Sequence, residues 1–242
     1  MFTDPLLAYA TKTAHVDLEL ARISQLDKMQ CDDASANRFY ELFRQAAESG
    51  SAYAMCMCSR FCIMGWGTIQ SNDKAFWWAE KAAATGFAPG HFEVGTCFEQ
   101  GVGVSINFDQ AIRHYELAIE GGFGFAAFHL ARTYSEGKSC ARHMIKAVEY
   151  AKRAYLLNEP MASSLLASWY ELGDGVVRDT KEAVLWYERS AAIGDSLACH
   201  RLSMAYATGE LGLTKNGELA QKYAAMFESL LSTAEIKLGI QT

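Results

Sequence analysis

The sequence is poor in proline, has no excess of positive charge and contains no long apolar run. Only 3 of its 242 residues are proline, whereas 50% are hydrophobic, so we expect a folded chain. Lys and Arg number 22 against 28 Asp and Glu, which gives a net charge of −6. A nucleic-acid partner is therefore not expected, because phosphates are bound by clustered Lys and Arg.

Membrane insertion and secretion also lack their usual signals. A span would need about 18 consecutive apolar residues, and no such run occurs. The first 30 residues carry charges of both signs, from Asp4 to Asp27, which does not fit a secretory signal. These observations predict a cytoplasmic protein with no membrane partner.

The sequence offers no recognisable set of catalytic residues or metal ligands. Its seven cysteines are an odd number with no recurring spacing, which argues against a ladder of disulfides. A structural zinc site needs four converging ligands, and no second cysteine pair or histidine pair accompanies the segment from Cys56 to Cys62. The six histidines are scattered along the chain. We expect no catalytic residue, no metal and no cofactor.

A glycine returns every 36 residues, and this is the most informative feature of the chain. One series is Gly65, Gly101, Gly137, Gly173 and Gly209, and a second is Gly50, Gly86, Gly122, Asn158 and Gly194. Gly and Asn tolerate the left-handed backbone found after helices, so both series predict helix stops. Two stretches of about a dozen residues lie between the stops of each repeat. Each repeat is therefore predicted to be a helical hairpin.

The predicted first helix of each repeat has its own apolar pattern. Small residues recur at Ala54, Gly90, Ala126, Ala162 and Ala198. An apolar stripe at helical spacing follows them, in which Cys58 and Cys62 stand where other repeats have Val94 or Tyr134. We therefore expect both cysteines to be small core residues.

The segments GVGVSINFDQAIRHYELAIEGG (101–122) and GDGVVRDTKEAVLWYERSAAIG (173–194) resemble the Sel1-like repeat. The resemblance covers repeats at 51–86, 87–122, 123–158, 159–194 and 195–230, and a degenerate repeat at 14–50, with a flank at 1–13 and a C-terminal cap at 231–242. Because the family is related to the tetratricopeptide repeat, it implies an all-α, right-handed α/α superhelical solenoid of about six 36-residue helical hairpins, treated as a single domain.

Three residues depart from the repeat pattern. Ser139 and Leu211 replace the second glycine of the loop, which other repeats keep, and these loops are predicted to be reshaped. Leu219 replaces the alanine of the second helix in the last repeat.

The resemblance also implies a protein-binding face. By analogy with tetratricopeptide arrays, the first helices line the concave side, and the repeat register selects the side chains that point into it. They are Tyr53, Cys56, Arg60, Phe92, Thr96, Glu99, Phe125, Phe128, Arg132, Met161, Ser168, His200 and Met204. Several are large apolar groups that a soluble array would not expose without a partner. Arg60 and Arg132 are interpreted as contacts for acidic groups of that partner. The alternative is that tight winding simply packs these side chains.

We therefore predict a non-enzymatic scaffold, adaptor or inhibitor that binds a protein or peptide partner in its groove. The resemblance implies a bacterial protein of a kind that includes signalling adaptors, secretion-associated factors and immunity proteins, which neutralise a toxin or effector, and the sequence does not choose among these uses. One alternative is a small-ligand receptor or an enzyme that uses the groove. Another is a self-assembling structural protein, such as a homodimer formed through the apolar tail at 231–242.

Overall fold

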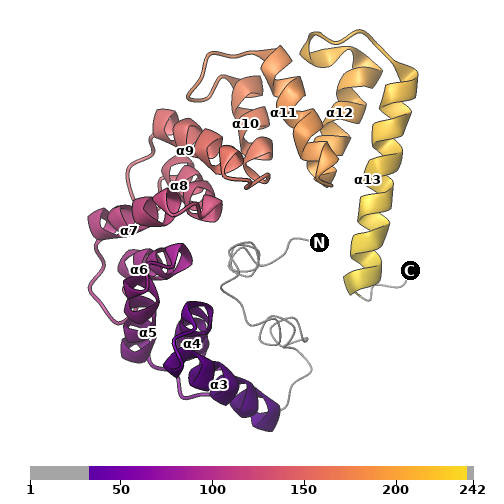
Figure 1. The fold of residues 1–242 in the computed structure, drawn as a ribbon. Coiled ribbons are helices and arrows are strands. Elements are labelled where there is room, and N and C mark those ends of the chain that lie inside the picture. The colour runs from indigo at the N-terminus through magenta and orange to yellow at the C-terminus, as the bar shows by residue number, and fades with distance from the viewer. Residues whose placement is uncertain (1–32, 239–242) are drawn as a thin grey trace. The chain divides into compact units, whose positions relative to one another are not determined.

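The computed structural model describes residues 33–238, and every regular element in that range is a helix (Figure 1). The predicted all-α fold is confirmed. The helices are α3 (Asp33–Glu48), α4 (Ala52–Met64), α5 (Asn72–Ala84), α6 (Ala88–Gln100), α7 (Phe108–Glu120), α8 (Gly124–Glu136), α9 (Met144–Leu156), α10 (Ala162–Leu172), α11 (Thr180–Ala192), α12 (Ser196–Thr208), the short 3₁₀ helix η2 (Glu210–Gly212) and α13 (Gly217–Leu238). The predicted flank at 1–13, the first helix of the degenerate repeat and residues 239–242 lie outside this range.

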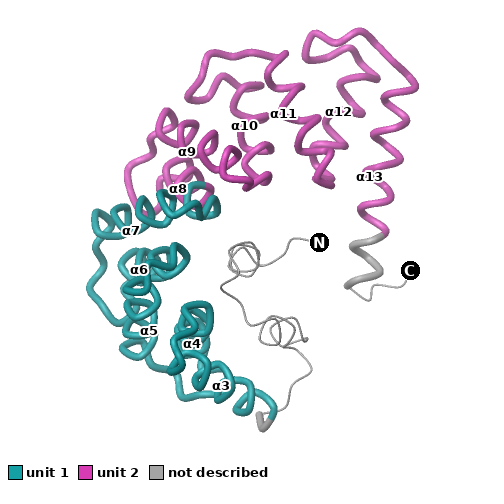
Figure 2. The backbone as a smooth tube through the Cα atoms, viewed as in Figure 1, with its two compact units in different colours: residues 1–127 teal, residues 128–242 magenta. Residues whose placement is uncertain are grey.

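The chain divides into two compact units, residues 1–127 and 128–242, with the boundary inside α8 (Figure 2). In the N-terminal unit, α4 pairs with α5 and α6 pairs with α7, and α5 packs on α6. In the C-terminal unit, α10 pairs with α11 and α12 pairs with α13, and α11 packs on α12. Within each unit the repeats are therefore helical hairpins that pack on their neighbours in chain order.

Both predicted series of helix stops are confirmed by the backbone. Every glycine of the two series has a positive φ, between 67° and 100°. Asn158 replaces glycine in the second series and keeps the left-handed conformation, with a φ of 63°. The second helices begin at polar caps, since Ser71, Asn107 and Asp179 each accept a hydrogen bond from a backbone N–H of the first turn. Local capping therefore sets the ends of the helices.

The second loop glycine lets each loop approach the preceding repeat. A Cβ added at Gly103 would lie 2.4 Å from the carbonyl oxygen of Asn72, and one added at Gly175 would lie 2.7 Å from that of Met144. Ser139 does not have a positive φ, so this loop is reshaped as predicted. Leu211 keeps a left-handed φ of 57°, and its loop differs by forming η2.

The last repeat contains one extra residue. In four repeats, six positions separate the left-handed glycine after the first helix from the cap of the second, as from Gly173 to Asp179. In the last repeat, seven positions separate Gly209 from Asn216, which accepts a hydrogen bond from the N–H of Leu219. The sequence interpretation of Leu219 was therefore wrong, because the buried helix alanine is Ala220, one residue later.

The cores of the repeats are made of small and apolar side chains. Cys58 and Cys62 are fully buried, which confirms their prediction as core residues. Burial raises the pKa of the Cys58 thiol to about 12, so this thiol stays protonated at neutral pH.

Within residues 33–238, no helix combines the length and apolar character that crossing a membrane requires.

Candidate functional site

Helix α12 of the C-terminal unit exposes apolar side chains along one face. Leu197 and Met204 are 76% and 46% exposed, and His200 is exposed between them. Their spacing of three to four residues places them on one side of the helix. The other side is buried and consists of Ala198, Cys199, Leu202 and Ala205. Leu197 and Met204 are therefore exposed on the hairpin surface, whereas the ring of His200 between them also contacts that of Phe227 on α13, with centroids 5.0 Å apart.

Helix α10 adds a further apolar side chain on the first helix of the preceding repeat. Leu172, at the end of α10, is 72% exposed. Its neighbour Glu171 is bonded to Arg201 of α12, so the two helices are linked at this point. We call the exposed residues Leu172, Leu197, His200 and Met204 the α10–α12 face.

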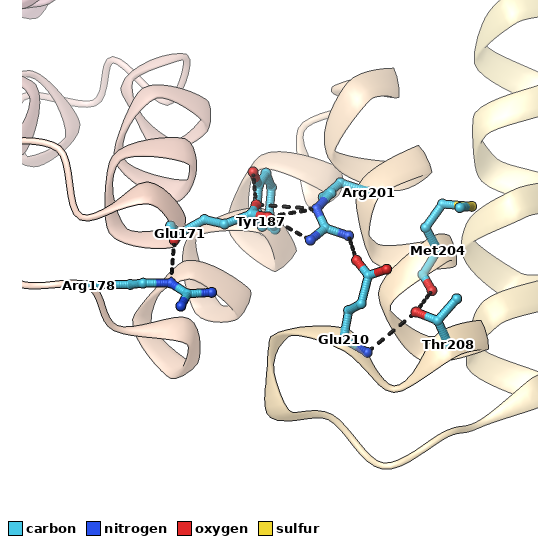
Figure 3. Close-up of polar contacts among 7 residues, drawn as sticks. All are labelled: Glu171, Arg178, Tyr187, Arg201, Met204, Thr208 and Glu210. Carbon is cyan, nitrogen blue, oxygen red and sulfur yellow. Dashed lines mark hydrogen bonds and ion pairs between the residues drawn. The ribbon is translucent and has the colours of Figure 1, made fainter.

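A polar network joins α10, α11 and α12 beside this face (Figure 3). Arg201 donates hydrogen bonds from Nε and Nη2 to the carboxylate of Glu171, at distances between 2.6 and 3.2 Å. Its Nη1 donates to Glu210 at 2.7 Å. The hydroxyl of Tyr187 donates to Glu171 at 2.7 Å. One arginine therefore holds two carboxylates, and one of these carboxylates also binds a tyrosine.

The charges of this network are fixed at neutral pH. Burial alone would raise the pKa of Glu171, but hydrogen bonds from Arg201 and Tyr187 bring it below the usual range. Burial and the neighbouring Glu171 raise the pKa of Tyr187, which keeps this hydroxyl protonated as a donor. The side chains of Arg201 and Glu171 are only 26% and 19% exposed. Arg201 and Glu171 therefore form an internal ion pair, to which Arg201 adds a bond to the more exposed Glu210.

Part of the network recurs in the N-terminal unit. Tyr115 donates to Glu99 at 2.7 Å, and these residues lie 72 positions before Tyr187 and Glu171. The residue 72 positions before Arg201 is His129 of α8, and the ion pair between first helices in the N-terminal unit joins Arg60 to Glu93 at 2.7 Å. The tyrosine–glutamate pair is therefore a repeated element, to which Arg201 adds a cation in the C-terminal unit.

A second recurring contact ends the first helices. Arg178, in the loop after α10, donates from Nε to the carbonyl oxygen of Glu171 at 2.9 Å (Figure 3). Arg142 donates in the same way to Ser135 at 3.0 Å. These arginines satisfy backbone carbonyls at the end of a helix, so their position is explained by helix capping.

Several predicted face residues of the N-terminal unit are buried or engaged. Tyr53, Cys56 and Phe92 are 1%, 0% and 7% exposed. The ring of Phe92 lies 5.4 Å from that of half-buried Phe125. Arg60 is held by Glu93. Two further residues are half-buried and hydrogen-bonded, namely Thr96, which donates to the Phe92 carbonyl, and Glu99, which accepts from Tyr115.

The predicted residues of the C-terminal unit are more accessible. His200 and Met204 are exposed, and Met161, Ser168 and Phe128 are half-buried. The side chain of Arg132 is 55% exposed and pairs with Glu136 of the same helix at 2.8 Å. The structure therefore brings His200 and Met204 together on the α10–α12 face.

Sequence analysis missed Arg201, Tyr187 and Glu210 as members of the site. Arg201 follows His200 on α12, and its partner Glu171 lies 30 residues earlier. Arg60 and Glu93 also join successive first helices, in the reverse order and 33 residues apart. Opposite charges about one repeat apart on successive first helices are the signal that could have revealed both pairs.

The α10–α12 face is suited to contact with another macromolecule. Its exposed groups are apolar or aromatic, and the adjacent charges are paired with each other. Within residues 33–238, no group of three or more His, Cys, Asp or Glu side chains converges to hold a metal ion. Chemically, the arrangement can bury apolar surface and hold two helices in register.

Comparison with known proteins connects this architecture to one family and several solved structures. The family model described as the Sel1 repeat matches residues 40–51, 52–87, 88–123, 124–159, 160–195 and 196–226. No curated protein is similar enough in sequence to count as a match.

Three solved structures show the same fold. A protective antigen of uropathogenic Escherichia coli with an SLR fold is 23% identical, with a TM-score of 0.68. The match covers 88% of this chain and 49% of that one, so this chain spans about half the length of the antigen. A Sel1 repeat protein from Oxalobacter formigenes is 21% identical with a TM-score of 0.67, over 92% of this chain and 99% of that one. An immunity protein from Pseudomonas aeruginosa is 20% identical with a TM-score of 0.56, over 95% of this chain and 84% of that one.

Proposed function

The chain belongs to the Sel1 repeat family, and we propose that it is a non-enzymatic protein that binds a protein or peptide partner through the α10–α12 face. Proteins of this family typically mediate protein–protein interactions. The observation that carries the proposal is the exposure of Leu172, Leu197 and Met204 on the first helices of one unit. A partner that covers them removes apolar surface from water.

The proposed contact is mainly apolar. Burying a leucine or methionine side chain contributes about 1.5–3 kcal/mol, so Leu197 and Met204 together can change affinity by more than tenfold. Arg201 and Glu171 already neutralise each other. The earlier interpretation of Arg60 and Arg132 as contacts for acidic groups has weaker support, because each pairs with a glutamate of this chain.

The finer proposal is that the partner is a bacterial toxin or effector that this chain inhibits in the cytoplasm. Its support is the fold shared with the P. aeruginosa immunity protein. An inhibitor requires a surface that stays available before the partner arrives, and the α10–α12 face meets this requirement among the described residues.

The test is affinity capture from a lysate of the source organism, followed by measurement of the dissociation constant for the protein retained. The variant is Leu197→Ser with Met204→Ser, and the matched control is Leu185→Ser, since Leu185 of α11 is 45% exposed but belongs to a second helix. We expect binding at least about tenfold weaker for the double variant and unchanged for the control. Equal binding by all three proteins, with equal thermal stability, would refute the proposed face.

Self-association through the tail at 231–242 is kept as the alternative, because Leu231 of α13 is 43% exposed. Light scattering on the full chain and on a chain ending at residue 230 distinguishes the two. A dimer that becomes a soluble monomer on truncation would favour the tail as an interface.

A further inference from the structure

Two histidines face each other in the hairpin formed by α6 and α7. The Nδ1 atoms of His91 and His114 lie 3.3 Å apart. Their ring centroids are 5.5 Å apart, and the ring planes meet at 36°. The His114 ring also stacks on Phe98, with centroids 5.8 Å apart. Both histidines are half-buried, so packing holds two imidazole nitrogens close together.

This pairing is particular to one hairpin. The same repeat positions hold Met55 and Trp78, Ala127 and Tyr150, and Ser163 and Trp186 in other hairpins. Those pairs fill the position with a small or apolar side chain opposite an aromatic ring. The hairpin therefore does not need two imidazoles to pack, and their presence together calls for another explanation.

The separation of the two nitrogens matches that of two ligands on one metal ion. A tetrahedral Zn²⁺ lies about 2.0–2.1 Å from each imidazole nitrogen, which places two such nitrogens about 3.3–3.4 Å apart. Coordination also needs a neutral ring with a free lone pair. Burial lowers the pKa of both histidines, and the neighbouring His91 lowers that of His114 further. Both shifts favour the neutral ring, and the distance between the two nitrogens is the observation that points to the metal.

We propose that His91 and His114 form a two-histidine site for a divalent transition-metal ion of the Zn²⁺, Ni²⁺ and Cu²⁺ class. Imidazole is a ligand that suits these ions. The part of the chain that the structure describes brings no third His, Cys, Asp or Glu to the pair, so water or a side chain of a bound partner completes the coordination. The site lies in the N-terminal unit and is independent of the α10–α12 face.

A hydrogen bond between two neutral rings would give the same distance, and metal titration separates the two explanations. Chain stripped with a chelator is titrated with ZnCl₂, NiCl₂ and CuCl₂ by calorimetry, and its thermal unfolding is followed in parallel. We expect one ion per chain and a rise in Tm of several degrees that saturates with metal. Absence of binding at a molar excess of all three ions would overturn the proposal.

Substitutions of the two histidines test whether these side chains hold the ion. His91→Gln and His114→Gln are each expected to abolish the metal-dependent rise in Tm, whereas His200→Gln, at an exposed histidine of α12, is expected to retain it. Undiminished binding by both single variants would contradict the assignment. If either variant fails to fold, electron paramagnetic resonance of Cu²⁺ on the unaltered protein decides, because two imidazoles give resolved nitrogen hyperfine structure and fewer than two would overturn the proposal.

Discussion

Replacing Arg201 with Met removes the cation that ties α10 to α12. Met keeps an unbranched side chain that replaces the aliphatic stem of the arginine, so the change removes the guanidinium with its charge and hydrogen bonds. Glu171 would then keep the bond from Tyr187 but lose both donors of Arg201. Because the Glu171 side chain is only 19% exposed, water cannot fully replace these donors.

The magnitude follows from burial and from the number of charged hydrogen bonds. Hydrogen bonds to charged groups contribute about 1.5–3 kcal/mol, and removing one partner from a fully buried pair costs about 3–5 kcal/mol. The pair of Arg201 and Glu171 retains some exposure, 26% and 19%. The bond to Glu210, which is 52% exposed, adds less than about 1 kcal/mol. We therefore expect Arg201→Met to lower the free energy of unfolding by about 2 kcal/mol.

The loss should depend on pH in a defined direction. The pKa of Glu171 in the folded protein lies below its ordinary value of 4.5. A lowered folded pKa gives stabilisation that is present above the unfolded pKa and disappears as pH falls through the folded pKa. The difference in stability between the unaltered chain and Arg201→Met should therefore be largest near neutral pH and shrink in acid below about pH 4.

Urea unfolding of a double-mutant cycle tests this reasoning. The cycle consists of Arg201→Met, Glu171→Gln and the combined variant, with Arg132→Met as the control, because the Arg132 side chain is 55% exposed and its pair should contribute less than about 1 kcal/mol. We expect a coupling energy of at least about 1 kcal/mol between Arg201 and Glu171. A coupling below about 0.3 kcal/mol at neutral pH, or a loss that grows on acidification, would refute the argument.

Three further predictions concern the backbone and the thiols. Gly103→Ala should lower the free energy of unfolding in urea by more than about 2 kcal/mol, since the new Cβ would lie 2.4 Å from a backbone oxygen. Gly122→Ala should lower it by only about 1 kcal/mol, because no atom lies near the new Cβ. Because Asn158 has a φ of 63°, Asn158→Ala should lower the stability by about 1 kcal/mol, and Asn158→Gly should change it by less than about 0.5 kcal/mol. A larger loss of stability with Gly would show that the asparagine side chain contributes. Iodoacetamide should label half-exposed Cys140 before Cys58, whose pKa is raised to about 12, as peptide mass spectrometry can check.

Much of the fold could be predicted because its helix ends depend on local backbone requirements. A residue with left-handed backbone, such as Gly173, is needed wherever a first helix ends and the chain turns into the loop. The glycines that return every 36 residues therefore locate the ends of the helices in each repeat. The last repeat escaped this reasoning at one point. A fixed period hides the extra residue before Asn216, so Leu219 was assigned to the position that Ala220 occupies.

The candidate site was less predictable because a repeat register gives the direction of a side chain and not its neighbours. Tyr53 and Leu197 occupy the same repeat position, yet their exposed fractions are 1% and 76%. Arg60 was interpreted as a contact for acidic groups of a partner, but in the structure it pairs with Glu93 on the next first helix. Charge pairing across repeats depends on tertiary packing, which the spacing along the chain does not specify.

The contrast between recurring and unique residues indicates where function can change without loss of the fold. Residues that hold the hairpins, such as Ala198 and Gly209, recur in register and are small or left-handed for structural reasons. Leu197 and Met204 do not recur with the period, and both side chains stay exposed on α12. Their substitution should therefore alter the contact with a partner while the buried side of α12 keeps the hairpin folded. A binding defect in the double serine variant can accordingly be attributed to the surface, because the stability of the array depends on other residues.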